Sequence, residues 1–192
     1  MIHNLLRDKE IILASASPRR KEIFKMIGIS ALQMPAHIKE ETFSNNPRKL
    51  VTTHARNKAL AIRKIVDNDY LIVGSDTVVF QKSEILEKPE NKHQAAEFLT
   101  RLSGTYHYVY SGVAISYKNQ VYSNYERTKV FFRNLSAYEI EEYINTNEPM
   151  DKAGAYGIQG MGSQFVKKIS GCYFNVMGFP VYCFYKLLKE VL

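Results

Sequence analysis

The sequence has few cysteines and no long run of apolar residues. Its two cysteines, Cys172 and Cys183, both lie in the last quarter of the chain and match no metal-binding spacing. Two thiols cannot form a disulfide framework, so a reduced, cytoplasmic setting is expected. No apolar run approaches the roughly 18 residues of a membrane span. Residues 1–10 are charged rather than apolar, so no secretory signal is expected.

Several catalytic signatures are missing as well. No Cys/His cluster has zinc spacing, and neither a Gly-x-Ser-x-Gly elbow nor a Gly-x4-Gly-Lys-Ser/Thr phosphate loop occurs. The five histidines are scattered, and each one alone is more typical of a structural or solvated residue than of a catalytic one. These absences set aside zinc sites, α/β-hydrolases and P-loop enzymes.

The composition is that of an ordinary globular protein with a basic charge. Of the 192 residues, 45% are apolar and 23% are charged, which argues against disorder. A chain of this length buries roughly 70% of its unfolded surface. We therefore expect a single domain over residues 1–192, with two lobes that share one sheet. The net charge of +7 predicts an anionic partner: a nucleic acid, an anionic lipid surface or a phosphorylated small molecule.

Helix and strand patterns alternate along the chain. The polar pair Lys118-Asn119 separates two runs rich in Val, Tyr, Phe and Thr, which predicts an antiparallel hairpin. Ser136 and Glu139 form a capping-box signature. Alternation with a hairpin predicts an α/β fold with a mixed sheet. The expected strands cover residues 10–15, 70–80, 107–117, 120–133 and 165–169; helices are expected to begin at Ser17-Pro18, at Asn46-Pro47, after a turn at Leu86–Pro89, at Ser136 and with Pro180 as first helical residue.

The segment Ser15-Ala-Ser-Pro-Arg-Arg-Lys21 has the features of an anion site. It joins a buried strand to the start of a helix, where backbone N–H groups and the positive end of the helix dipole attract anions. Ser15 and Ser17 add hydroxyl donors, and Arg19 and Arg20 add guanidinium groups that suit phosphate oxygens. The alternative is a capped helix with a solvated basic first turn. Cations in a first turn oppose the dipole, which favours the anion site.

An acidic residue, Asp76, interrupts an apolar β-rich run. A carboxylate in a strand interior is costly unless it holds a divalent metal or orients a water. The alternative, equally open from the residues, is a bulge or turn in which Asp76 caps backbone N–H groups. Two lysines are weaker candidates. Lys88 on a turn is more typical of a solvated lysine, and Lys58 beside a buried helix face either snorkels or reaches a site.

The segment Glu148–Gly162 is dense in glycine, with four glycines within nine residues. Glycine permits positive φ and a close approach to a ligand. Gln159 in this segment carries an amide that can donate to and accept from the edge of a base. No strand-then-helix frame surrounds the segment, so it is not a Rossmann fingerprint. The alternative is an ordinary glycine loop.

Together these segments resemble the Maf family of nucleoside triphosphate pyrophosphatases, also called septum formation inhibitor homologues. They occur in the family's order and cover nearly the whole chain. The joint match is specific, although no single piece is. The matching stretches are Leu13-Ala-Ser-Ala-Ser-Pro-Arg-Arg20, Gly74-Ser-Asp-Thr-Val-Val79, Leu86-Glu-Lys-Pro89, Leu102-Ser-Gly104, His107, Ser111-Gly-Val113, Glu148-Pro-Met-Asp-Lys-Ala-Gly-Ala-Tyr-Gly-Ile-Gln-Gly160, Phe165-Val166 and Gly178-Phe-Pro180.

The resemblance implies a fold, a reaction and a cofactor. The fold is the Maf/inosine-triphosphatase-like α/β fold, a mixed elongated sheet flanked by helices with a cleft between two lobes. The reaction is hydrolysis of a nucleoside triphosphate between its α and β phosphates, which yields the monophosphate and pyrophosphate and cleans the nucleotide pool. Family members use a divalent cation such as Mg²⁺ or Mn²⁺ and are often homodimers. Neither a membrane nor a stable nucleic-acid partner is expected.

The resemblance also implies a role for each matching residue. Asp76 would be the general base that activates water, and Glu40 and Asp76 would be metal ligands. The family usually has an acidic pair after an Ile or Val, whereas this chain has Ile38-Lys39-Glu40. Glu40 can fill the second acidic position, but Lys39 replaces the first acid. The triphosphate would be lined by Ser15, Arg19, Arg20, Lys58 and Lys88. The positions Arg19, Thr77 and Gln159 resemble the branch that prefers dTTP and UTP, whereas the 7-methyl-GTP branch tends to an aromatic residue, Gln and Glu there.

Two other function classes fit the same sequence. A non-enzymatic nucleic-acid-binding protein would use the basic charge together with 13 Tyr and 10 Phe for phosphate contacts and stacking. No RNA-recognition aromatic motif appears, which argues against it. A nucleotide sensor linked to cell division would keep the same fold and bind the nucleotide without hydrolysing it.

Overall fold

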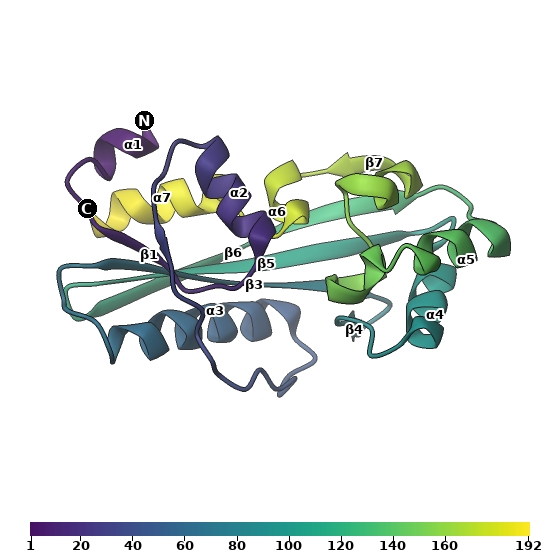
Figure 1. Cartoon of the computed structure of the whole chain (residues 1–192), viewed down its shortest axis with the longest axis horizontal. Helices are drawn as coiled ribbons and strands as arrows, with labels where there is room; N and C mark the ends of the chain where they lie inside the picture. The colour runs from purple at the N-terminus through teal and green to yellow at the C-terminus, as the bar shows by residue number, and fades with distance from the viewer.

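The computed structural model describes residues 1–192, and a single seven-stranded sheet runs along its length (Figure 1). In space the strands follow the order β2-β1-β3-β5-β6-β7, and β4 pairs with β3 off this path. The strands are β1 (Ile11–Leu13), β2 (Leu32–Gln33), β3 (Leu71–Gln81), β4 (Glu84–Leu86), β5 (Tyr106–Tyr117), β6 (Gln120–Phe132) and β7 (Val166–Ser170). The helices are α1 (Ile2–Leu5), α2 (Pro18–Met26), α3 (Pro47–Arg63), α4 (Lys92–Leu102), α5 (Ala137–Asn145), α6 (Tyr173–Met177) and α7 (Val181–Val191), with 3₁₀ turns η1 (Glu148–Asp151), η2 (Ala153–Ala155) and η3 (Gly160–Phe165).

The sheet is mixed, as expected. β2, β1 and β3 are parallel to one another, and every other pairing is antiparallel. The predicted hairpin is confirmed: β5 and β6 turn at Lys118 and Asn119, whose φ angles are 45° and 63°. Two successive left-handed residues give the turn twist that suits paired strands. The capping box of α5 is also confirmed, because the Ser136 and Glu139 side chains each bond the other residue's backbone N–H.

Helices cover both faces of the sheet. α3 lies on one face, where Ala55 and Ala59 pack against Ile72 of β3. On the other face α2 and α7 cover one end of the sheet, and α4 and α5 cover the opposite end. Val113 and Val109 of β5 belong to these two cores, and their even spacing places both on that face. The expected α/β architecture, an elongated mixed sheet flanked by helices, is confirmed.

Two glycines let α3 lie almost directly on the sheet. A Cβ atom on Gly74 would lie 2.1 Å from the carbonyl oxygen of Ala55, and one on Gly112 would lie 2.2 Å from that of Val51. Backbone oxygens of a helix cannot move aside alone. Any side chain at either glycine therefore forces the whole helix away from β3 and β5.

We expect Gly74→Ala to lower the free energy of unfolding by about 3 kcal/mol, because overpacking of this kind displaces α3. Gly28→Ala is the matched control. Its φ of 73° imposes backbone strain, yet nothing lies within 4 Å of its Cβ position, so about 1 kcal/mol is expected. Denaturant unfolding measures both changes. Equal losses of unfolding free energy in the two variants would contradict the close packing of α3 on β3.

Several local expectations are corrected by the structure. β3 runs unbroken through Asp76, so a bulge or turn at that residue is wrong. Leu86 ends a short strand, β4, that pairs with β3, and the expected turn begins only after it. Pro180 is the N-cap of α7 rather than its first residue. Ser17 is the N-cap of α2, but its side chain makes no capping bond. Instead its backbone N–H donates to Ser15 Oγ at 3.2 Å.

No helix combines the length and the apolar character that crossing a membrane requires. The expectation of one domain over residues 1–192, with two lobes that share the sheet, stays a prediction.

Candidate active site

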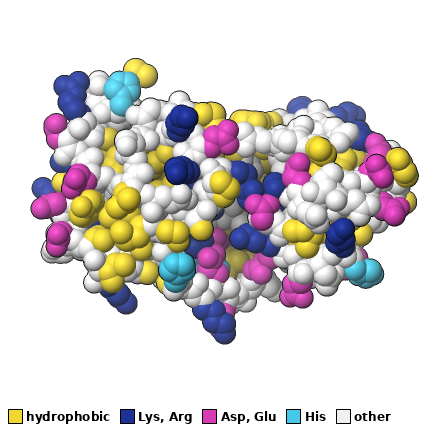
Figure 2. Space-filling model, viewed as in Figure 1, with side chains coloured by type: hydrophobic (Ala, Val, Ile, Leu, Met, Phe, Trp, Pro, Cys, Tyr) yellow, Lys and Arg dark blue, Asp and Glu magenta, His cyan; other side chains and the backbone are white.

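Strand β3 has an open stretch along one edge. On that edge β1 pairs with residues 71–73, and β4 pairs with residues 79–81. The stretch 74–78 between them has no neighbouring strand on that side. A cleft of about 770 Å³ opens at this gap. Figure 2 shows a hollow near the middle of the face, with basic and acidic side chains gathered around it.

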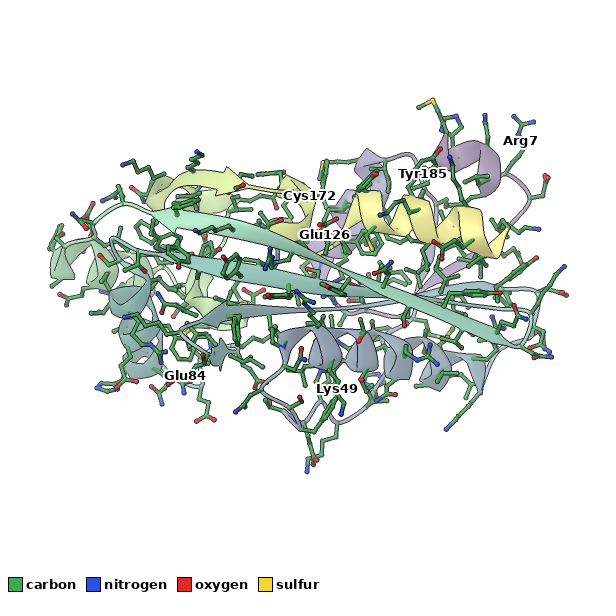
Figure 3. The ribbon with its side chains drawn as sticks, turned by 180° about the vertical axis from the view of Figure 1, so that it is seen from behind. Arg7, Lys49, Glu84, Glu126, Cys172 and Tyr185 are labelled. Carbon is green, nitrogen blue, oxygen red and sulfur yellow. The ribbon has the colours of Figure 1, made fainter.

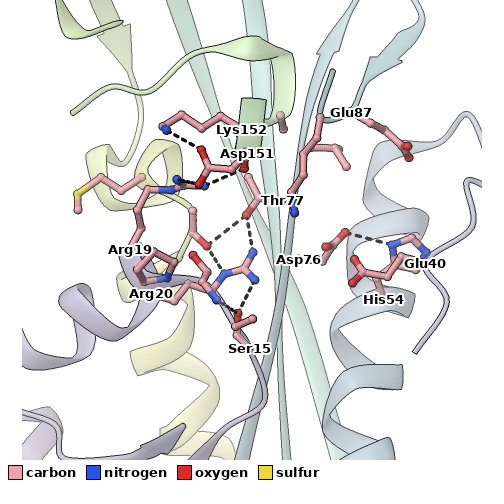
Figure 4. Close-up of a pocket in the computed structure, with 18 of the residues that line it drawn as sticks. Ser15, Arg19, Arg20, Glu40, His54, Asp76, Thr77, Glu87, Asp151 and Lys152 are labelled. Atoms are coloured by element: carbon pink, nitrogen blue, oxygen red, sulfur yellow. Dashed lines mark hydrogen bonds and ion pairs between the residues drawn. The ribbon is translucent and has the colours of Figure 1, made fainter. Parts of the chain in front are cut away.

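The turn between β1 and α2 forms one wall of the cleft. Arg20 is buried there, and its guanidinium donates to Ser15 Oγ at 3.0 Å, to Thr77 Oγ1 at 3.1 Å and to the Gly178 carbonyl oxygen at 2.8 Å (Figure 4). These bonds tie α2 to β3 and to the loop before α7. A guanidinium has five N–H groups, so two remain for an anion in the cleft. Burial lowers the pKa of Arg20, yet a guanidinium stays charged.

An ion pair crosses the cleft between segments far apart in sequence. Arg19 Nη1 lies 2.9 Å from Asp151 Oδ2, and Arg19 Nη2 donates to the Asp151 backbone oxygen at 3.3 Å. Lys152 Nζ lies 2.7 Å from the other carboxylate oxygen of Asp151. Figure 4 shows the three charges in a row. This row joins the first turn of α2 to the glycine-rich segment that carries Gln159.

A second charged group lies on the α3 side of β3. Lys58 Nζ lies 2.9 Å from Asp76 Oδ1 and 2.7 Å from Glu40 Oε2. His54 Nδ1 lies 3.2 Å from Asp76 Oδ2, and His54 Nε2 lies 3.1 Å from the Glu41 carbonyl oxygen. Lys58 and Asp76 are each 7% exposed, so these charges interact with little screening by water.

Three basic side chains keep the Asp76 carboxyl ionised. Burial alone would raise the pKa of Asp76, but the hydrogen bond from His54 and the charges of Lys58 and Arg20 outweigh it. The pKa of Asp76 is therefore held well below its usual range. The hydrogen bond to Asp76 in turn raises the pKa of His54. Both ring nitrogens of His54 face oxygen acceptors, which suits an imidazolium that donates twice. The carboxylates of Asp76 and Glu40 then face two cations, Lys58 and His54.

The same acidic group has the donors of a divalent-cation site. Glu40, His54 and Asp76 each offer one ligand atom, and these atoms all lie within 4.8 Å of one another. Carboxylate oxygens are the ligands that Mg²⁺ prefers, and imidazole adds a ligand for Mn²⁺. The ammonium of Lys58 bonds both carboxylates, in the place where a cation would bind them. The donor set fits a divalent metal once Lys58 moves aside and His54 loses a proton, because only a neutral imidazole has a lone pair for a metal.

The structure brings every predicted site residue to this one cleft, although what each does there stays a prediction. Lys39 is not among them: its side chain is 85% exposed and pairs with Glu41. The cleft is lined by Ser15, Arg19, Arg20, Glu40, Lys58, Asp76, Thr77, Lys88 and Gln159.

Three further residues of the cleft were missed from the sequence. In the sequence His54 is one of five scattered histidines, yet it lies one helical turn before Lys58 on the buried side of α3. That i, i+4 spacing is the signal that links the two. Asp151 has no such local signal, because its partner Arg19 is 132 residues away. Lys152 joins the group through its ion pair with Asp151.

Comparison with known proteins decides the family. A family model described as "Maf-like protein" matches residues 10–191. The chain belongs to the Maf family. This Maf protein is 43% identical over 185 residues to a dTTP/UTP pyrophosphatase of Clostridium perfringens, a match that covers 94% of this chain and 96% of that one. It is 39% identical over 181 residues to a dTTP/UTP pyrophosphatase of Aquifex aeolicus, covering 94% and 95% of the two chains.

The fold of this Maf protein also resembles a solved structure outside these relatives. The Staphylococcus aureus Ham1 protein superposes with a TM-score of 0.54 at 14% sequence identity, over 96% of this chain and 100% of that one. At this identity the likeness concerns the fold alone. It supports the expected inosine-triphosphatase-like arrangement of the sheet and helices.

Proposed function

We propose that this Maf protein is a nucleoside triphosphate pyrophosphatase that hydrolyses dTTP and UTP to the monophosphate and pyrophosphate. The observation that carries the proposal is that the basic side chains expected from the sequence meet one buried carboxylate, Asp76, in a single cleft. These basic side chains are Arg19, Arg20, Lys58 and Lys88. A triphosphate needs cationic donors, and its hydrolysis needs a group that takes a proton from water. The full-length relatives named dTTP/UTP pyrophosphatase support the choice of substrate.

In the proposed reaction the Asp76 carboxylate accepts a proton from a water molecule. The water oxygen attacks the α-phosphorus, the bond from that phosphorus to the bridging oxygen breaks, and pyrophosphate leaves with the bonding electrons. Asp76 then returns its proton to the solution. The catalytic gain comes from positioning the water in line with the leaving group and from stabilising the phosphate charge.

The proposal assigns the remaining residues by their place in the cleft. The triphosphate lies against the turn of Ser15, Arg19 and Arg20 on one wall and against Lys88 on the other. Lys58 is paired with both acids in the structure. An incoming triphosphate offers it a new anionic partner. Transfer of Lys58 to phosphate removes one of the cations that suppress proton uptake by Asp76.

Glu40 and Asp76 would hold the divalent cation, Mg²⁺ or Mn²⁺, with His54 as a third donor. When bound, the metal neutralises phosphate charge. Lys58 and the metal would compete for the same two carboxylates. Substrate draws Lys58 to phosphate and the metal replaces it at Glu40 and Asp76, so the two would bind cooperatively.

A pyrophosphate-release screen over dTTP, UTP, CTP, GTP and 7-methyl-GTP tests the proposed function. We expect the highest kcat/KM for dTTP and UTP. Bound nucleotide recovered intact after long incubation with Mg²⁺ or Mn²⁺ would instead favour a nucleotide sensor. The proposal also includes a cytoplasmic location and a homodimer, which cell fractionation and sedimentation velocity test.

Base selection gives a sharper prediction. Gln159 is half-buried at the cleft, in the loop that Arg19 reaches through Asp151. Its amide can accept from N3–H and donate to O4 of thymine or uracil, whereas cytosine presents the reverse pattern. A mismatched buried polar pair costs about 1–3 kcal/mol. We expect Gln159→Glu to lower kcat/KM for dTTP and UTP by roughly tenfold to a hundredfold relative to CTP.

The control for this prediction is Gln164→Glu, which makes the same chemical change at an exposed position outside the cleft. Its substrate ranking should match the wild type. An unchanged ranking in Gln159→Glu would mean that Gln159 does not read the base.

A further inference from the structure

One part of the sheet has no helix over it. α3 covers the middle of β3, β5 and β6 and begins at Pro47, while the strands continue past its first turn (Figure 3). Strand register places two half-exposed pairs there side by side, Tyr106 opposite Phe131 and Tyr108 opposite Lys129. Cross-strand partners share one side of a sheet. The rings therefore form part of an open surface on the α3 side, away from the cores under α4 and α5.

Cations lie among these rings. Lys129 Nζ is 3.6 Å from the ring centroid of Tyr106 and 4.9 Å from that of Phe131. The Arg127 guanidinium is 4.9 Å from the ring centroid of Tyr108, and Lys168 Nζ of β7 is 6.0 Å from that of Phe131. We call this surface the aromatic–cation face; it consists of Tyr106, Tyr108, Arg127, Lys129, Phe131 and Lys168.

The charge on the aromatic–cation face has one sign. β4 and β6 each contain one acidic residue, and register pairs Glu84 with Gln81 and Glu126 with Ser111, both buried on the opposite side of the sheet. Glu84 bonds Arg101 of α4 there. No acidic residue of β4 or β6 therefore lies among the three cations of the face, Arg127, Lys129 and Lys168. A surface of this kind attracts anions.

From this placement we infer that the aromatic–cation face binds single-stranded nucleic acid, a partner outside the proposed nucleotide hydrolysis. Aromatic rings give stacking surfaces for unpaired bases, and basic side chains between them meet the phosphates. Ring centroids follow one another at 5.9 Å from Tyr108 to Tyr106 along β5 and at 6.0 Å from Tyr106 to Phe131 of β6. This spacing suits successive bases better than one small molecule.

A second copy of this chain fits the face less well. A two-fold interface would bring the same patch of both copies together. Lys129 and Arg127 of one copy would then lie close to the cations of the other copy, and like charges across an interface are unfavourable.

The sequence shows no RNA-recognition motif at this face. Its rings and cations come from β5, β6 and β7, and only the pairing of these strands brings them together.

Fluorescence anisotropy with labelled U12 and dT12 tests the inference on the full chain. Tight binding at low salt should weaken as salt rises, with a slope of about 0.7 in log K per log salt for each phosphate neutralised. Phe131→Ala should weaken binding by about fivefold to a hundredfold through lost stacking. Lys168→Gln should reduce the slope by about 0.7. A comparison of U12 with dT12 distinguishes RNA from DNA as the preferred partner.

Lys189→Gln is the matched control, because it makes the same change at an exposed residue of α7, which covers the opposite face of the sheet. Its binding and slope should stay close to the wild type, and all three variants should keep wild-type hydrolysis of dTTP. Equal effects of Lys189→Gln and Lys168→Gln would overturn the inference. So would displacement of U12 by excess dTTP, equal affinity for duplex DNA, or a dimer that Phe131→Ala dissociates.

Discussion

Replacing Asp76 with asparagine should lower kcat for dTTP by about 10²–10⁴, the usual contribution of a general base. Asparagine keeps the shape of the side chain and removes both the charge and the ability to take a proton from water. The other two carboxylates are already paired: Glu40, within 4.8 Å of Asp76, bonds Lys58, and Asp151 bonds Arg19. Steady-state kinetics with dTTP measures the loss.

Asp69→Asn serves as the control, because it makes the same change at an exposed residue just before β3. Circular dichroism should show native secondary structure in both variants. If Asp76→Asn retained near-normal kcat while folded, Asp76 would not be the base. Retained activity would contradict only the role of Asp76. The proposed preference for dTTP and UTP would still stand, because it depends on other residues.

Replacing Lys58 with methionine should weaken the fold and strengthen metal binding. The ammonium is the partner of two carboxylates at a nearly buried position. Breaking such a pair by removing one member costs about 3–5 kcal/mol, because uncompensated charge is left behind. A divalent cation can supply that missing charge. Mn²⁺ should therefore raise the Tm of Lys58→Met by more than it raises the Tm of the wild type.

The same variant should bind substrate poorly. Loss of a charge-assisted bond to phosphate, worth about 1.5–3 kcal/mol, should raise KM for dTTP by roughly tenfold to a hundredfold. Lys49→Met, at an exposed position on the same helix, controls for the lost charge and for helix effects. An equal Mn²⁺-induced shift of Tm in the wild type and Lys58→Met would argue that Lys58 and the metal do not compete.

Much of the fold is visible in local sequence signals. The Lys118-Asn119 turn, the Ser136 capping box and the Asn46-Pro47 helix start are each set by residues within a few positions of one another. Strand β4 has no such signal, because three residues become a strand only when β3 offers an edge. The same holds for β2, a two-residue strand that exists through its pairing with β1.

The candidate site likewise has residues that the sequence predicts and contacts that only the folded chain shows. The sequence singles out Arg20 and Asp76 because each places a charge where its local structure disfavours one. It does not reveal that Arg20 bonds Thr77 or that His54 bonds Asp76, because these contacts depend on how distant segments pack. Family resemblance supplies the order of the motifs, and only the folded chain supplies the distances.

The gap in the edge of β3 separates a stiff part of the cleft from adjustable parts. Asp76 and Thr77 lie on a strand that is aligned with β5 from Ile72 to Phe80 without interruption. Lys88 and Gln159 come from segments outside the sheet, which carry no strand ladder to hold them in register. Substitutions or insertions in those segments can therefore change which nucleotide fits while the carboxylate stays in place. A fold built this way can acquire new substrates by altering its rim and still keep one reaction.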